Sequence, residues 1–388
     1  MPFGGMYLPP FVILWFFVAL IGGNKQTAIN GFKNKWFLLL FSFIVFHCIS
    51  ALLSHNKQEA LSSVEVKLSF LAFPVYIFLF DYKTDTIKRI FAGFVSGCLF
   101  ALLACLGRAT FHYFTAHNSD YFFYTDFSYF IHVGYFSMYL LFAIVIMQMA
   151  YPIWFKNDAM IKGLRYAFSL VFVIGIFLCA SKIGIIALFI TLLALAMAQV
   201  KDKLNVKASF LLLLIIAALT FVTYKIIPMP FDRIKSAIGT ATNGNIDKTS
   251  TESTAVRMLI WNESAEIFKD NFWLGTGSGD ANDALHARYE ASGLTGALKS
   301  NLNTHNQFFQ TGIALGVFGL IILLVTTFGA MLYGFVKKNL MLCIFSIIII
   351  LNFLVESMLQ TQAGNLFFVY FLCLLLKYNP QKLEETKP

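Results

Sequence analysis

Two side chains suited to chemistry, those of Arg257 and His305, belong to one long polar stretch. Arg257 lies inside the segment from Pro228 to Thr304, and His305 follows it directly in the run Asn303–Gln307. A guanidinium binds phosphate through two parallel hydrogen bonds and stays charged at any pH. An imidazole titrates near neutrality and accepts a proton from a hydroxyl. A long polar stretch with such residues, set between apolar runs, makes chemistry at a membrane surface the first hypothesis.

Each residue also has a purely structural interpretation. Arg257 can form a surface salt bridge with Glu263, Glu266 or Asp270. His305 can lie at an interface and hydrogen-bond to the neighbouring asparagines. The sequence around each residue leaves both interpretations open.

The composition identifies the class of protein. The chain of 388 residues is 58% hydrophobic and 13% charged, whereas an average soluble domain is about 25% charged. Its apolar residues form continuous runs of about 18 or more with almost no charge, which is typical of transmembrane helices. The sequence therefore predicts an all-α, polytopic transmembrane helical bundle.

We expect about eleven membrane spans from these runs. The first, from Leu8 to Gly23, lacks the basic start and the small-residue cleavage site of a signal peptide, so it is interpreted as a short span. The spans are expected near residues 8–23, 36–54, 65–81, 88–107, 131–151, 165–180, 183–200, 206–227, 308–335, 340–356 and 362–377.

Basic residues concentrate in alternate short loops. With eleven spans these loops all fall on one side, which the positive-inside rule makes cytoplasmic. The stretch 228–304 and the aromatic loop from Arg108 to Ile131 then lie on the outer side. The formal net charge of +9 follows from this sidedness and does not indicate a nucleic acid partner. Exceptions in the intervening loops are Lys57, Lys67, Arg108 and Lys182.

The spans divide the chain into three parts. Residues 1–227 hold about eight N-terminal transmembrane helices, 228–304 form an outer loop subdomain with short helices, and 305–388 hold about three C-terminal helices and a short cytoplasmic tail. Within the loop, helical spacing predicts one helix from Thr251 to Lys269, ending at Asp270-Asn271, and a second from Asp280 to Ala291.

Two glycine-rich runs punctuate this loop. Gly275-x-Gly277-x-Gly279 is a weak nucleotide fingerprint because no βαβ unit surrounds it, and a tight turn between the two loop helices is favoured. The run from Ser292 to Gly296 predicts a second turn before His305.

Two further charged residues lie at the ends of spans. Lys182 occupies a very short outer hairpin, where a cation is either an anchor at the membrane surface or a functional group. Glu356 lies near the outer end of a span; a carboxylate there is normally paired, so it is either a partner of a cation such as Lys182 or a catalytic group.

The cysteines point to packing. All six lie within or at the ends of apolar spans: Cys48, Cys98, Cys105, Cys179, Cys343 and Cys373. A disulfide framework is not expected, and no His, Asp and Glu cluster has the spacing of metal ligands.

Combined, these motifs resemble the O-antigen ligase and O-antigen polymerase family of bacterial membrane glycosyltransferases. The similarity extends from about Ser42 to Leu376 and rests most on the His-Asn stretch. The matching motifs are Thr304–Gln310 with Gly312, Leu315-Gly316 and Gly319-Leu320; Arg257-x-x-x-Trp261; Trp273–Gly279; Ser181-Lys182 with Gly184; and Glu356 with Gly364.

The resemblance implies about twelve transmembrane helices and a large periplasmic loop, in the bacterial inner membrane. It implies transfer of a glycan from undecaprenyl diphosphate to a hydroxyl of lipid A core or of a protein, by inversion and without a metal or other cofactor. By residue, it makes Arg257 a diphosphate ligand, His305 the base and Lys182 the second cation. Trp261, Asn306 and Glu356 are expected to support them.

The chain departs from the family pattern in two places. A lysine stands at 182 where the family has an arginine. The predicted spans number one fewer than the family's twelve, so we expect the start of the sequence to fall inside the family's first-helix region. A polymerase of the same family, which uses a lipid-linked repeat as acceptor, is the alternative function. A transporter or flippase is disfavoured because no inverted repeat is present and the unusual polar residues gather at one face.

Overall fold

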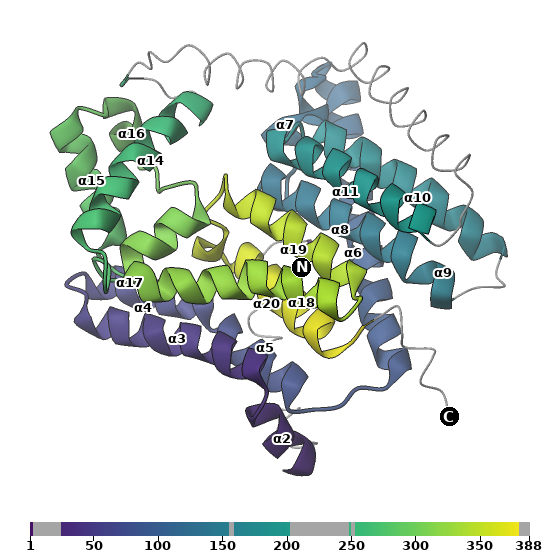
Figure 1. The fold of residues 1–388 in the computed structure, drawn as a ribbon. Helices are drawn as coiled ribbons and strands as arrows, with labels where there is room; N and C mark the ends of the chain where they lie inside the picture. The colour runs from purple at the N-terminus through teal and green to yellow at the C-terminus, as the bar shows by residue number, and fades with distance from the viewer. Residues whose placement is uncertain (3–24, 155–158, 202–247, 250–252, 380–388) are drawn as a thin grey trace. The chain divides into compact units, whose positions relative to one another are not determined.

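The computed structural model describes residues 1–2, 25–154, 159–201, 248–249 and 253–379 (Figure 1). The regular elements within these residues are all helices, as predicted. They fall into two compact units, which we describe separately. The predicted spans near 8–23 and 206–227 lie outside the described residues.

The first unit is organised around helix α8 (Val133–Met149). Every residue of α8 except Gln148 is buried, because helices pack against it on several sides. Gly184 shows how close one of them comes, since a Cβ at this position would lie 2.5 Å from Ser137 Oγ of α8. The other elements of this unit are α6 (Thr84–Ala116), η1 (Asp120–Phe122), α7 (Tyr124–Phe127), α9 (Tyr151–Trp154), α10 (Ala159–Leu178) and α11 (Lys182–Lys201).

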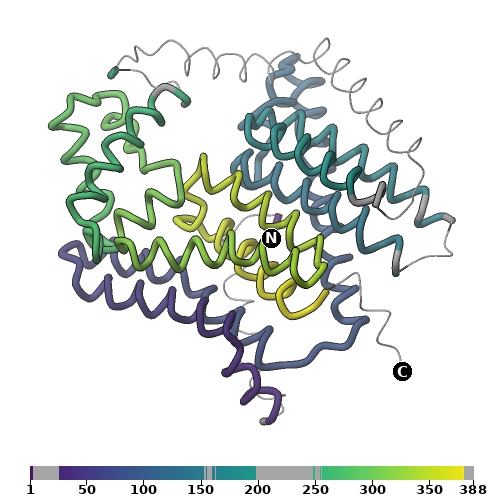
Figure 2. Tube along the Cα trace, in the orientation of Figure 1, coloured from purple at the N-terminus to yellow at the C-terminus, as the bar shows by residue number. Residues whose placement is uncertain are grey.

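The second unit joins segments from both ends of the chain. Figure 2 shows the early helices alongside the late ones, with α3 (Lys35–Leu53) against α17 (Gln307–Leu324) and α5 (Ser69–Phe78) against α20 (Gln362–Lys377). Buried phenylalanines fill the contacts; the Phe43 and Phe70 rings lie 4.6 Å apart and Phe70 lies 6.2 Å from Phe368. The remaining elements of this unit outside the polar stretch are α2 (Lys25–Phe32), α4 (Lys57–Lys67), η2 (Val325–Gly329), α18 (Ala330–Val336), α19 (Leu340–Phe353) and η3 (Met358–Gln360).

The described part of the polar stretch folds into three short helices within the second unit: α14 (Ser253–Asp270), α15 (Ala281–Ser292) and α16 (Thr295–Lys299). Both predicted loop helices are confirmed, including the end of the first at Asp270. The predicted turn from Ser292 to Gly296 is shorter than expected. Gly293 ends α15 with φ +69°, and α16 begins at Thr295.

A break in α17 anchors the loop helices. Gly316 has φ 64° and ψ −161° within this helix, a conformation that is essentially restricted to glycine. The peptide groups released there bond to the chain around the predicted glycine turn: Val317 N–H donates to Phe272 O at 2.8 Å and Thr276 N–H to Ile313 O at 2.7 Å. The Gly275–Gly279 run is therefore a tight turn, as predicted, and it satisfies the backbone groups of a broken apolar helix.

Four helical segments are long and apolar enough to cross a membrane: Lys35–Leu53, Lys57–Phe78, Thr84–Ala116 and Gln307–Val336. Five shorter apolar helices accompany them among the described residues. The fold is thus an all-helical multi-pass membrane protein, and the count of about eleven spans remains a prediction.

Three predicted boundaries are wrong. The span expected near 65–81 starts earlier, because Asn56 caps a helix that begins at Lys57 and continues, with one interruption at Leu68, to Phe78. The loop expected from Arg108 starts later, because α6 continues to Ala116. The span expected to end at Glu356 ends at Phe353, which leaves Glu356 in the connection to η3.

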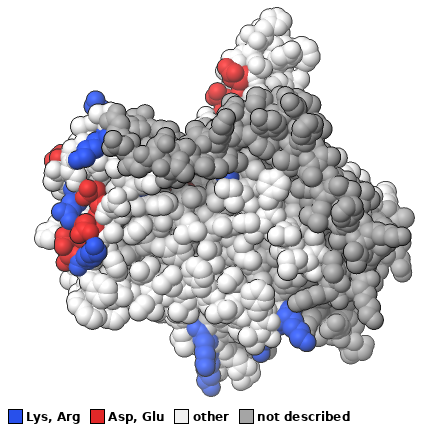
Figure 3. All heavy atoms as spheres, turned by 45° about the horizontal axis from the view of Figure 1, so that its top comes forward, with Lys and Arg blue, Asp and Glu red and all other residues white. Residues whose placement is uncertain are grey.

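The cysteines largely follow the packing prediction. All six are free thiols, and all except Cys48 are buried. Charged side chains in the view of Figure 3 gather mainly at the edge formed by the α14–α16 group, whereas most of the remaining visible described surface carries no charge.

Candidate functional site

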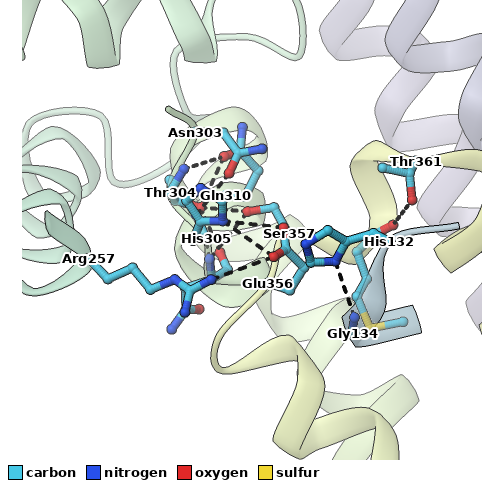
Figure 4. Close-up of polar contacts among 12 residues, drawn as sticks. His132, Gly134, Arg257, Asn303, Thr304, His305, Gln310, Glu356, Ser357 and Thr361 are labelled. Atoms are coloured by element: carbon cyan, nitrogen blue, oxygen red, sulfur yellow. Dashed lines mark hydrogen bonds and ion pairs between the residues drawn. The ribbon is translucent and has the colours of Figure 1, made fainter. Parts of the chain in front are cut away.

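Glu356 connects the two residues that the sequence singled out. Its Oε1 lies 3.3 Å from His305 Nδ1, and its Oε2 lies 3.8 Å from a terminal nitrogen of Arg257 (Figure 4). All three side chains are partly exposed, with exposed fractions between 18% and 23%. The structure therefore brings Arg257, His305 and Glu356 together in a cluster that a substrate can reach.

Helix α14 positions Arg257 and links it to the histidine segment. Arg257 and Trp261 are four residues apart and so lie on the same face of the helix. The indole Nε1–H of Trp261 donates to the carbonyl oxygen of Thr304 at 3.0 Å, and its ring lies 6.5 Å from that of Phe309. The Arg-x-x-x-Trp spacing thus places the cation at Glu356 and fixes the residue that precedes His305.

The backbone at His305 is held in an unusual conformation. Its φ is 44°, in the left-handed region that residues with a Cβ seldom adopt. The side chain of Asn303 accepts a hydrogen bond from His305 N–H at 2.9 Å. Immediately afterwards Asn306 begins α17, since its side-chain oxygen accepts from the N–H groups of Phe308 and Phe309 at 2.9 and 3.2 Å. Such an N-cap contributes about 0.5–2 kcal/mol.

The segment that carries Glu356 is bonded directly to the histidine segment. Asn306 Nδ2 donates to Leu354 O at 3.1 Å, and the hydroxyls of Thr304 and Ser357 lie 2.9 Å apart. Gln307 Oε1 accepts from Leu359 N–H at 2.7 Å. These contacts hold the two segments together and set the distance between His305 and Glu356. The supporting role of Asn306 in the reaction remains a prediction.

Sequence inspection missed Thr304, Gln310 and Ser357. Gln310 Oε1 accepts from both the N–H and the hydroxyl of Thr304, at 3.3 and 3.0 Å. The available signal was a run of polar residues entering an apolar helix: such residues are costly in a membrane unless they bond to one another. Ser357 gave no comparable signal, because its partner Thr304 is distant in the sequence.

The salt bridges that the sequence suggested for Arg257, with Glu263, Glu266 or Asp270, are not the ion pair that the structure shows. Arg257 forms its ion pair with Glu356. Glu263 and Asp270 instead lie beside Arg288, at 3.8 and 3.4 Å.

Glu266, the third partner considered for Arg257, lies 2.7 Å from Lys269. Glu356 forms an ion pair with Arg257, as expected of a carboxylate in this position. It also lies beside the ring of His305.

Lys182 belongs to the first unit. The predicted hairpin is confirmed, because α10 ends at Leu178 and α11 begins at Lys182 itself. Ala180 adopts φ 47° to make the turn, and the Ser181 hydroxyl accepts from Gly184 N–H at 3.2 Å. The lysine is thus placed on the first turn of an apolar helix.

The cluster has the elements of acid–base chemistry. A carboxylate only accepts hydrogen bonds, so Nδ1 of a neutral His305 carries the proton towards Glu356 and Nε2 keeps a free lone pair. A proton taken up at Nε2 would produce an imidazolium. The adjacent carboxylate of Glu356 would stabilise its positive charge. Arg257 presents its N–H donors in a planar fork that matches the geometry of a phosphate.

One segment of the chain matches a known protein family. Residues 167–324 match the model of a protein family described as O-antigen ligase. The matched segment contains Lys182, Arg257, Trp261, His305 and Asn306, and it ends before Glu356. The match supports membership in the O-antigen ligase family. No curated protein matches the chain.

Proposed function

We propose that this membrane protein of the O-antigen ligase family transfers a glycan from undecaprenyl diphosphate to an acceptor hydroxyl at the periplasmic face of the inner membrane. The observation that carries the proposal is the shared carboxylate of Glu356, which contacts the base candidate His305 and the phosphate-binding candidate Arg257. The acceptor we favour is lipid A core, with a protein hydroxyl as the other possibility.

The reaction we propose is a direct displacement. The acceptor oxygen attacks the anomeric carbon of the donor sugar while the bond from that carbon to the diphosphate oxygen breaks. The acceptor proton moves to His305 Nε2. Undecaprenyl diphosphate leaves as an anion, and the configuration at the anomeric carbon is inverted.

The cations are assigned to the leaving group. Arg257 can bind two oxygens of the diphosphate through its planar fork, and Lys182 is proposed as a second, point-like charge. Preorganised charges that take up developing negative charge commonly provide the largest part of the lowering of a barrier. General-base catalysis by His305 adds roughly 10²–10⁴-fold in rate. Neither step requires a metal.

The ends of the helices support the proposed sidedness. Segment Gln307–Val336 is long enough to cross a membrane, and it begins beside His305 and is followed by Lys337 and Lys338. Helix α20 begins on the Glu356 side and ends at Lys377. Because basic residues prefer the cytoplasmic side, the cluster is assigned to the periplasmic side, where the lipid-linked head group is presented.

A polymerase of the same family is the second candidate. It would use the same donor and the same cluster, and it would differ only in its acceptor, a second lipid-linked repeat. Both functions require the base and the cations described above. The family match does not separate them.

Glycolipid profiling of a deletion strain separates them. A ligase predicts that long glycan disappears from its acceptor while undecaprenyl-linked polymer accumulates. Acceptor carrying a single repeat would instead identify a polymerase. An unchanged glycolipid profile, with no lipid-linked intermediate accumulating, would contradict both.

A further inference from the structure

A polar cavity lies behind the histidine segment, within the second unit. It has a volume of about 130 Å³ and is bounded by α4, the start of α15, Asn303 and η3. Because one water occupies about 30 Å³ of liquid, the cavity is larger than a single water site and comparable in size to one sugar ring. Hydroxyl and amide side chains dominate its lining: Ser62, Ser63, Ser278, Asn282, Gln310 and Gln360.

The hydroxyl of Ser278, which lines the cavity, is buried without a hydrogen-bond partner among the described residues. Buried polar groups of native proteins nearly always have a partner, so an exception requires an explanation. A ligand hydroxyl in the cavity would supply that partner once the Ser278 side chain rotates to bring Oγ to the cavity surface.

The amide side chains of Gln310 and Gln360 are hydrogen-bonded mainly through their oxygen atoms. Gln310 Oε1 is occupied by Thr304, whereas its Nε2 makes only a 3.5 Å contact with Asn282 Oδ1. Gln360 Oε1 faces Lys67 Nζ at 3.5 Å. The remaining amide N–H groups are not engaged by other described residues, so the lining offers oriented donors next to serine hydroxyls.

The buried side chain of Lys67 contacts two of the residues that line the cavity. Lys67 is 1% exposed, and its Nζ contacts Ser63 Oγ at 3.2 Å as well as Gln360. Within the described chain it forms no ion pair with a carboxylate. Because Lys67 occupies the acceptor oxygens of Ser63 and Gln360, the hydroxyl proton of Ser63 and the amide of Gln360 are left for a ligand.

The cavity adjoins the proposed catalytic segment through two shared residues. Asn303 lines the cavity and accepts from His305 N–H at 2.9 Å. Gln310 lines it too and holds Thr304. A ring bound in this cavity would therefore lie against the segment that positions the base.

We propose that this cavity binds one sugar ring of a glycan substrate by hydrogen bonds to its hydroxyls, with Ser278 Oγ as one of the partners. The inference rests on the proposed function, since it assigns a subsite for the substrate of that reaction. A neutral, hydroxyl-rich ring matches the oriented amides and hydroxyls. The ring belongs either to the donor glycan or to the acceptor, and both share this chemistry.

The test measures initial rates of the purified full-length protein. Undecaprenyl-diphosphate-linked glycan extracted from the host is varied at fixed lipid A core acceptor, and then the reverse. Ser278→Ala is expected to raise one KM by roughly 2- to 10-fold, the effect of one hydrogen bond. It should not lower the thermal unfolding midpoint, because the hydroxyl bonds to none of the described residues.

A second variant fills the cavity from its rim. Ser62 is exposed on α4, so Ser62→Phe should fold normally and raise the same KM by at least about 10-fold. The matched controls are Ser300→Ala and Ser300→Phe, since Ser300 is an exposed serine at the end of α16 outside the cavity.

The outcomes are distinct. A raised KM for the donor assigns the ring to the donor glycan, and a raised KM for the acceptor assigns it to the acceptor. Wild-type rates and KM values in both variants overturn the inference while leaving the proposed function intact. Absence of transfer by the wild-type protein would instead refute the proposed function.

Discussion

His305 Nδ1 lies 3.3 Å from Glu356 Oε1, although the two residues belong to different segments flanking α17 and α19. The distance is set by the buried contacts of Asn306 and Ser357 that join these segments. The carboxylate therefore contacts the imidazole directly, and we propose that it fixes the orientation of the ring.

Glu356→Gln removes the negative charge of residue 356 but keeps an oxygen that can accept a hydrogen bond from His305. A glutamine still accepts from Nδ1–H but cannot neutralise an imidazolium, so kcat should fall by roughly 10- to 100-fold. The KM for the donor should not rise, because the substitution removes the ion pair between Arg257 and residue 356 and does not hinder the binding of phosphate to Arg257. Steady-state rates check this, with exposed Glu290→Gln on α15 as the control. Wild-type kcat in Glu356→Gln would exclude the charge from the mechanism.

Trp261→Phe removes one hydrogen bond and keeps an aromatic ring against Phe309. Loss of the bond to Thr304 O should cost about 0.5–1.5 kcal/mol of stability and lower kcat about tenfold through misplacement of His305. Trp273→Phe is the control, since Trp273 is 65% exposed. The comparison requires kcat, KM and the unfolding midpoint of both variants; equal kcat in both would show that Trp261 does not position the site.

Much of the fold follows from the sequence because apolar runs and turn residues act locally. The runs predicted the helices, and helical spacing predicted α14 and α15. Boundaries such as that of α6, which continues past Arg108 to Ala116, were missed because packing and capping decide them.

The site itself was predicted only in part. Arg257 and His305 were found from their chemistry, but the partner of Glu356 was not determined, since pairing between distant segments leaves no periodic signal. The burial of Lys67 was equally hidden: in the sequence it is one more basic residue at the start of an apolar run. The packing of α3, α20 and η3 against α4 encloses it.

Gly316→Ala tests the break in α17. A Cβ there would lie 2.3 Å from Trp273 O, and φ 64° with ψ −161° is strained for alanine. We expect a loss of at least about 1–3 kcal/mol in stability and reduced yield in the membrane. Gly107→Ala in α6, where a Cβ meets nothing within 4 Å, should be neutral or slightly stabilising. Comparable unfolding midpoints for the two variants would contradict the observed break.

Asp280 should make the free energy of unfolding depend on pH in the acidic range. Its carboxylate accepts from the N–H groups of His55 and Asn56 at 2.8 and 2.7 Å. Partial burial raises the pKa of Asp280, but these hydrogen bonds and the His55 ring outweigh burial, so the pKa lies below its ordinary 3.8. A lowered folded-state pKa gives stability that is present above about pH 4 and lost as pH falls through the folded value.

Asp280→Asn should remove this contribution. Unfolding midpoints measured between about pH 3 and pH 7 should be lower for the variant near neutrality and converge with the wild type in acid. Asp120→Asn, at an exposed aspartate of η1, should retain the wild-type profile. Parallel profiles for Asp280→Asn and the wild type would show that the carboxylate makes no such contribution.

The most direct measurement is glycan transfer from purified undecaprenyl-diphosphate-linked donor to lipid A core by the purified protein and its variants. We predict that His305→Ala and Arg257→Ala abolish transfer at wild-type membrane expression, while Lys182→Arg retains it because a cation remains. The wild type must produce the ligated glycolipid for the comparison to count. Full transfer by His305→Ala would remove the histidine from the mechanism and contradict the assignment of this cluster as the catalytic centre.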